Sequence, residues 1–114
     1  MNIIATLNAF LELLISHMHE AIAFVLLMWG IHFINIATRM RLCYLGIIPR
    51  QPITILTGSI CSPFLHADFT HLIHNSLPLF AFCSILFANG IVYASCTIMA
   101  INILSGVLIW IIGR

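Results

Sequence analysis

Long apolar runs separated by short polar segments dominate the chain, and they predict helices rather than strands. Three runs, at residues 21–37, 71–88 and 91–112, contain no Asp, Glu, Lys or Arg. A hydrocarbon core about 30 Å thick is crossed by roughly 20 helical residues at about 1.5 Å each. With their flanking residues, these runs predict membrane-crossing helices at residues 20–38, 71–88 and 91–112.

The N-terminal segment and the segment between the first two crossings are less regular. Residues 3–15 are apolar but carry Asn8 and Glu12 on one helical face, which favours an interfacial helix or an extension of the first crossing. Residues 39–70 contain three prolines that interrupt any continuous helix, and their apolar pieces are too short to span. We expect a connector that lies on, or dips into, the membrane surface.

The resulting expectation is an all-α membrane protein, divided into an N-terminal extension at residues 1–19 and one partial helical bundle at residues 20–114. Asn89-Gly90 supplies a helix stop and a short turn, so the last two crossings should be antiparallel neighbours. Small residues in the last crossing allow close contact with other helices. They are Ala94, Ser95, Ala100, Ser105 and Gly106.

Composition supports the membrane interpretation and excludes other classes. Hydrophobic residues make up 62% of the chain, and its only formal charges are four arginines and three acidic residues, far below the roughly 25% charged residues of soluble domains. No basic cluster with interleaved aromatics is present, so nucleic acid is not expected as a partner. The four cysteines form no C-x-x-C pair and are expected to be free thiols, although a Cys43–Cys61 bridge is compatible with an oxidising face.

The stretch "SPFLHADFTHLIHNSLPLF", residues 62–80, gathers polar side chains at the start of a crossing. His71, His74 and Asn75 share one helical face, and His66 lies just before it. Such a patch can stabilise a developing oxyanion, bind a metal or satisfy other buried polar groups. The metal option lacks a clear fourth ligand, so no metal and no cofactor are expected. The pair His17-x-His19 is interpreted as interfacial decoration.

Together with "LGIIPR" at residues 45–50, this stretch resembles the rhomboid intramembrane serine proteases, in which F-L-H, a short spacer and H-x-x-x-N open the second core helix. The resemblance covers roughly residues 20–114. It implies a rhomboid-like partial bundle and an endopeptidase that cleaves transmembrane substrates. It also implies that His71 and Asn75 stabilise the oxyanion and that His66 supports them by organising the loop.

The family's nucleophile, in a G-x-S-G motif, and its general-base histidine are absent from this sequence. Ser105-Gly106 is the nearest candidate, but Ile103 stands where the motif needs glycine, so Ser105 is interpreted as a packing residue. We therefore expect an interrupted reading frame and a fragment that is inactive alone, self-associates or needs a complementing fragment. Two alternatives remain open: a non-catalytic rhomboid-like protein that binds transmembrane partners, and a His-rich metal or haem subunit.

Two features of the sequence bear on its topology, the positions of the arginines and the rhomboid resemblance, and they disagree. The arginines at positions 39, 41, 50 and 114 fall on one side of a three-helix arrangement, and the positive-inside rule places that side in the cytoplasm. The rhomboid resemblance places the same side outside. We expect the topology that the resemblance implies, in a multi-pass protein of the bacterial plasma membrane.

Overall fold

The structure, a computed structural model, describes residues 2–113, and within that range it is helical without strands. Its helices follow in the order α1 (Ile3–Ser16), α2 (Met18–Ala37), the short 3-10 helix η1 (Arg41–Leu45), α3 (Pro52–Cys61), a second 3-10 helix η2 (Ser62–Phe64), α4 (Phe69–Ala88) and α5 (Ile91–Ile112). Three of them, α2, α4 and α5, are long and apolar enough to cross a membrane. The expected all-helical class with three candidate crossings is confirmed.

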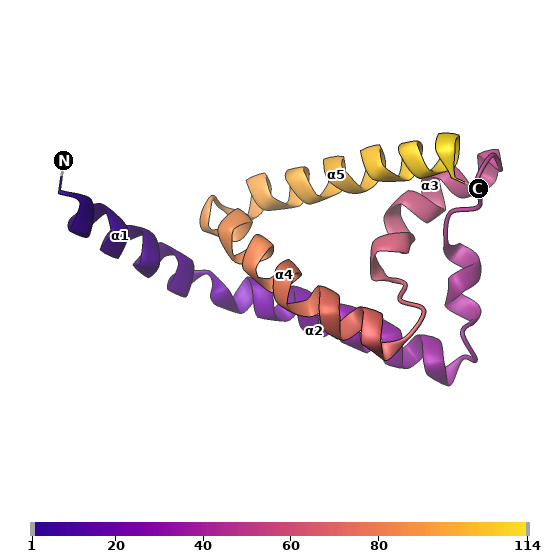
Figure 1. The fold of residues 1–114 in the computed structure, drawn as a ribbon, viewed down its shortest axis with the longest axis horizontal. Coiled ribbons are helices and arrows are strands. Elements are labelled where there is room, and N and C mark those ends of the chain that lie inside the picture. The colour runs from indigo at the N-terminus through magenta and orange to yellow at the C-terminus, as the bar shows by residue number, and fades with distance from the viewer. Residues whose placement is uncertain (1, 114) are drawn as a thin grey trace.

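The helices enclose a triangle (Figure 1). One side is formed by α2 and α4, which lie side by side, the second by α5, and the third by α3 and the connector around it. Helix α1 continues from the start of α2 and extends away from the triangle. All of its residues except Leu14 are exposed, so α1 contributes little to the packed part of the chain.

The contact between α2 and α4 is built from one face of α2. The fully buried residues of that helix are Ala21, Met28, His32 and Asn35. Each is three, four or seven residues from the next, that is one or two helical turns, so all four lie on one side of the helix. The Trp29 indole donates a hydrogen bond of 2.9 Å to the Ser76 hydroxyl on α4. Apolar packing and an interhelical hydrogen bond therefore both join these two helices.

Asn35 also organises the turn after α2. Its side-chain oxygen accepts a 3.0 Å hydrogen bond from the Leu42 amide, and its amide nitrogen lies 3.2 Å from the Cys43 sulfur. The backbone passes through positive φ at Arg39 and Met40 between these groups. All four cysteines are free thiols.

The connector contains more regular structure than its prolines suggest. Pro52 occupies the first turn of α3, where a missing N–H costs no helical hydrogen bond, and the helix runs on for ten residues before Pro63 falls within η2. The expectation that prolines would interrupt any continuous helix here was therefore wrong for residues 52–61. Two of the prolines bracket a helix instead of breaking one.

Helix α5 is fastened to the connector at its C-terminal end. The Trp110 indole donates a 2.9 Å hydrogen bond to the Gln51 carbonyl, and the Arg50 amide donates one of 3.2 Å to the Trp110 carbonyl. Gly106 faces α3 so closely that an added Cβ would lie 3.0 Å from the Ser59 Cα and closer still to its side chain. Of the small residues in this helix, Ala94 and Gly106 are buried, whereas Ala100 and Ser105 are exposed.

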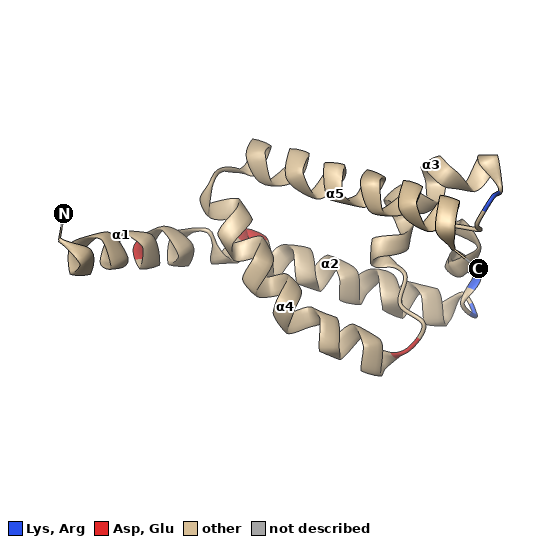
Figure 2. Cartoon of the chain, turned by 45° about the horizontal axis from the view of Figure 1, so that its top comes forward, with Lys and Arg blue, Asp and Glu red and all other residues tan. Residues whose placement is uncertain are grey.

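Apart from Glu12, which lies within α1, the charged residues of the described range lie at helix ends or in the connector (Figure 2). Arg39, Arg41 and Arg50 lie on the connector side, at the end of the molecule away from α1. Arg114, the fourth arginine of the chain, lies outside the described residues. The placement of Arg39, Arg41 and Arg50 agrees with membrane-crossing helices whose charged residues stay near the membrane surface.

Gly106 yields the first testable prediction. Replacing Gly106 with Leu should lower the free energy of unfolding by about 1–3 kcal/mol, because a side chain at this position overpacks the contact with Ser59. Unfolding in mixed micelles, followed by circular dichroism, measures the change. Ser105→Leu is the matched control, since Ser105 is exposed one residue earlier. Equal losses in both variants would contradict the packing role.

Candidate functional site

The N-terminal turn of α4 positions the two residues expected to stabilise an oxyanion. The Asp68 carboxylate caps this helix and accepts a 2.8 Å hydrogen bond from the His71 amide. Because Asp68 starts the helix at Phe69, His71 and Asn75 fall one turn apart on one face. Both side chains are exposed on the helix surface.

His66 lies beside this face, in the loop that connects η2 to α4. Its side chain is only 5% exposed. The Asn75 amide nitrogen lies 3.4 Å from His66 Nε2, and His66 Nδ1 lies 3.4 Å from the Phe64 carbonyl oxygen. A neutral ring with its proton on Nδ1 satisfies both contacts, because Nδ1 then donates to the carbonyl and Nε2 accepts from the amide.

His71 completes the cluster from the other side. Its ring meets the ring of His66 edge to face, with centroids 5.4 Å apart and an interplanar angle of 66°. The structure therefore brings together His66, His71 and Asn75, which are nine or fewer residues apart in the sequence. His74 is exposed on the same helix and contributes no hydrogen bond to the cluster.

Burial lowers the pKa of the His66 imidazole from its ordinary value, because removal from water disfavours the charged ring. Neighbouring His71 and His32 lower it further, and the contact with the Phe64 carbonyl opposes the shift. His66 is therefore neutral near pH 7, the form in which Nε2 accepts from Asn75.

A pocket of about 330 Å³ opens beside the cluster. Its walls come from α2, η2, the following loop and α4, and they are apolar except at His66 and Asn75. The lining residues are Met28, Pro63, His66, Asn75, Pro78, Leu79 and Phe82. One hydrogen of the Asn75 amide faces His66, so the second remains for an oxygen atom placed at this pocket. His71 packs against the His66 ring and is not part of the pocket wall.

A metal centre has little support in the geometry. Within residues 2–113, no group of three or more His, Cys, Asp or Glu side chains is arranged to hold a metal ion. The Asp68 carboxylate is engaged at the start of α4, and the Nε2 atom of His66 faces Asn75. The remaining N–H groups of Asn75 and His71 can donate to an oxygen atom of a ligand.

His32 is a neighbour of the cluster that the sequence interpretation overlooked. It lies on the buried face of α2, is 1% exposed, and packs edge to face against Phe69 at the start of α4, with ring centroids 4.8 Å apart. Neither ring nitrogen has a hydrogen-bond partner among the described residues. A lone histidine inside the apolar run "WGIHFINIA" was the available signal.

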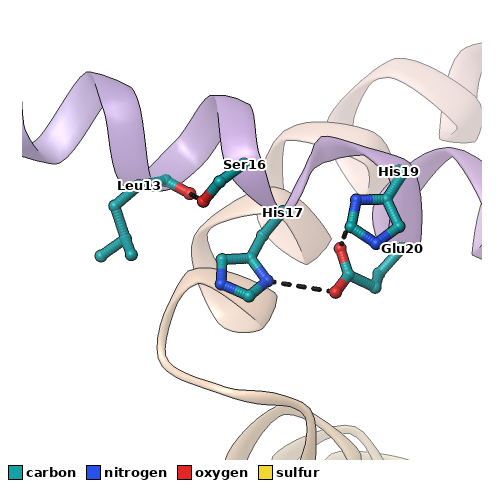
Figure 3. A network of polar contacts seen from close by, with 5 residues as sticks. All are labelled: Leu13, Ser16, His17, His19 and Glu20. Atoms are coloured by element: carbon teal, nitrogen blue, oxygen red, sulfur yellow. Dashed lines mark hydrogen bonds and ion pairs between the residues drawn. The ribbon is translucent and has the colours of Figure 1, made fainter.

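A second polar group lies at the junction of α1 and α2, far from this cluster in the chain. Figure 3 shows the rings of His17 and His19 on either side of the Glu20 carboxylate, with Nδ1–Oε distances of 3.1 and 3.2 Å. The pair expected to be interfacial decoration thus contacts the one carboxylate at the start of α2. The contact between His17 and Glu20 spans the junction of the two helices, whereas His19 and Glu20 are neighbours within α2.

The chain matches no protein-family model, no curated protein and no solved structure. The function of the chain has therefore to be inferred from its residues and their geometry.

The lowered pKa of His66 predicts a pH dependence of stability. Unfolded His66 titrates near its ordinary pKa of about 6.5 and the folded residue titrates lower, so below about pH 6.5 the unfolded state binds more protons. The free energy of unfolding should fall as the pH drops from 7 toward the lowered pKa. Unfolding in mixed micelles at a series of pH values measures this slope.

Two variants separate the contribution of His66 from those of the other histidines. His66→Gln should make the free energy of unfolding less dependent on pH in this range, because the group with the lowered pKa is gone. His74→Gln, at an exposed position of the same cluster region, should leave the slope unchanged. A His66→Gln protein with the parent slope would show that His66 titrates normally.

Proposed function

We propose that this chain supplies the oxyanion-stabilising part of a rhomboid-type intramembrane serine peptidase that acts on transmembrane proteins. The observation that carries the proposal is that His66 and Asn75 line one pocket, with Asn75 Nδ2 3.4 Å from His66 Nε2, and that the His71 ring packs against His66. The same three residues carry the resemblance of the sequence to the rhomboid proteases. The proposed location is the bacterial plasma membrane, with several crossings.

The proposed chemistry is acyl transfer. A serine hydroxyl attacks the carbonyl carbon of a substrate peptide bond while a histidine base takes its proton, and the carbonyl oxygen becomes an oxyanion. The free N–H groups of Asn75 and His71 would donate to that oxyanion. Collapse of the intermediate expels the amine, which takes the proton from the base, and leaves an acyl-enzyme that water hydrolyses.

His66 acts in this scheme as a support for Asn75. Because its neutral ring accepts one amide hydrogen, the Asn75 side chain is held in one orientation, with its second hydrogen available. Donors fixed before the reaction stabilise a developing charge without the cost of reorganisation. The buried position of His66 keeps this support in place.

The serine has to come from outside the 114 residues, because the G-x-S-G motif is absent from them. The general base is proposed to come from the same source, because the rhomboid resemblance places that histidine on a later helix. A complementing polypeptide segment is the proposed source, and the chain alone is expected to be inactive. The absence of the nucleophile also supports a second candidate function, in which the chain binds transmembrane partners without cleaving them.

Asn75→Ala tests the peptidase proposal. The protein is isolated from its native membranes with any bound polypeptides, placed in liposomes, and supplied with a fluorescent reporter that has one transmembrane segment. Removing one oxyanion donor should lower kcat about 10²- to 10³-fold. His74→Ala is the matched control on the same helix and should retain the parent rate.

Two outcomes would contradict the proposal. Cleavage at the parent rate by Asn75→Ala would remove Asn75 from the chemistry. Failure of the isolated assembly to cleave the reporter or to react with a fluorophosphonate serine probe would reject the peptidase function and favour the non-catalytic alternative.

Topology provides a further test. With Cys43 as the only cysteine, a membrane-impermeant maleimide should label intact cells, because the proposed orientation places the connector outside and Cys43 is exposed. A cysteine introduced at Asn2, at the opposite end of the helices, should be labelled only after the membrane is permeabilised. The reverse pattern would establish the orientation that the arginines favour.

A further inference from the structure

Three arginines form a basic surface at the connector end of the molecule. Arg39, Arg41 and Arg50 are all exposed, and Figure 2 shows them at the end away from α1. The sequence contains no lysine, so every basic side chain other than histidine is an arginine. A guanidinium is planar and donates paired hydrogen bonds, a geometry that fits the oxygens of a phosphate group.

No acidic side chain among the described residues neutralises the basic surface. The ion pairs within residues 2–113 join Glu20 to His17 and His19 at the start of α2, whereas the basic surface follows the end of that helix. Asp68, at the start of α4, accepts a bond from the His71 amide and forms no ion pair within that range. The guanidiniums are therefore available to an anion that the described residues do not supply.

The basic surface lies at the depth of lipid headgroups. Helix α2 has 20 residues, roughly the number that spans a hydrocarbon core, and Arg39 and Arg41 follow its end at Ala37. Arg50 is held at the end of α5, because its amide donates to the carbonyl of Trp110 in the last turn of that helix. Both helices end on the connector side (Figure 1), where the anions of a bilayer are its phosphate groups.

Exposed apolar side chains accompany the arginines. Tyr44 is 83% exposed and Ile53 is 87% exposed, and Leu45 and Ile48 between them are exposed as well. In a water-facing surface these side chains would remain hydrated. At a bilayer they enter the acyl region while the guanidiniums stay among the headgroups. The surface thus suits a lipid better than a soluble anion.

Two of the arginines occupy a backbone conformation that favours glycine. The φ angle is 56° at Arg39 and 64° at Arg50, in the left-handed region that residues with a Cβ rarely adopt. Met40 shares this conformation, with a φ of 61°. Glycine at any of these positions removes the conformational cost, so an effect of the arginine side chain can be separated from an effect of the backbone.

We infer that the basic surface binds the phosphate headgroups of anionic phospholipids, with Tyr44 and Ile53 inserted among the acyl chains. The inference is independent of the peptidase proposal, because it requires neither a substrate nor a nucleophile. It also holds for either orientation of the chain in the membrane, since both faces of a bilayer carry headgroups.

The test uses the full chain in phosphatidylcholine bilayers to which lipid with brominated acyl chains is added. Bromine quenches tryptophan fluorescence, and Trp110 lies beside the basic surface through its bonds to Arg50 and Gln51. Brominated phosphatidylglycerol should bind more tightly than brominated phosphatidylcholine, by about 5-fold for each arginine that takes part. Rising salt should reduce this preference.

Arg39→Gly and Arg50→Gly should each lower the preference about 5-fold. Met40→Gly is the matched control, because it makes the same backbone change without removing a charge, and it should keep the preference of the parent. In a zwitterionic detergent, all three variants should have similar thermal stability, because glycine adopts positive φ without strain.

Equal quenching by the two lipids would overturn the inference, as would a parent preference in the double variant Arg39→Gly, Arg50→Gly. A loss in Met40→Gly as large as the losses in the arginine variants would also overturn it, because the effect would then come from the backbone. So would a photoreactive residue at position 44 that crosslinks in native membranes only to polypeptide, since a protein would then cover the surface.

Discussion

The pairing of α2 with α4 is the contact on which the arrangement depends. In a bilayer the hydrophobic effect does not drive helices together, so close packing and interhelical hydrogen bonds have to do so. The buried face of α2 and the bond from Trp29 to Ser76 meet both needs. The same pairing places Met28 in the wall of the pocket and His32 against Phe69, so it also shapes the surroundings of the polar cluster.

The three long helices could be predicted from apolar run length because the thickness of a bilayer sets the length of a crossing. Helix α3 could not be predicted in the same way. Proline is read as a helix breaker, but its effect depends on position, and Pro52 lies where the missing N–H is harmless. Helix α4 begins two residues before the expected start because Asp68 caps it, a signal that the sequence did contain.

In the candidate site too, relations within one helix could be predicted from the sequence, whereas contacts between separate segments could not. The i, i+4 spacing was enough to place His71 and Asn75 on one face, since helix geometry fixes that relation. The contact of His66 with Asn75 depends on the path of the intervening loop, and no periodicity describes such a path. His32 comes from another helix, 34 residues before His66, so its proximity follows only from the packing of α2 on α4.

The tight link between α4 and α5 has a consequence for biosynthesis. Asn89 and Gly90 alone separate the two helices, and Gly90 takes a positive φ of 99° to make the turn. Two helices joined so closely would enter a bilayer as one hairpin, so their transfer free energies would combine. Helix α5 is the more apolar of the two, so in such a hairpin it would offset the cost of bringing His71, His74 and Asn75 into the membrane. A translocon would then receive the polar start of α4 together with the segment best able to anchor it.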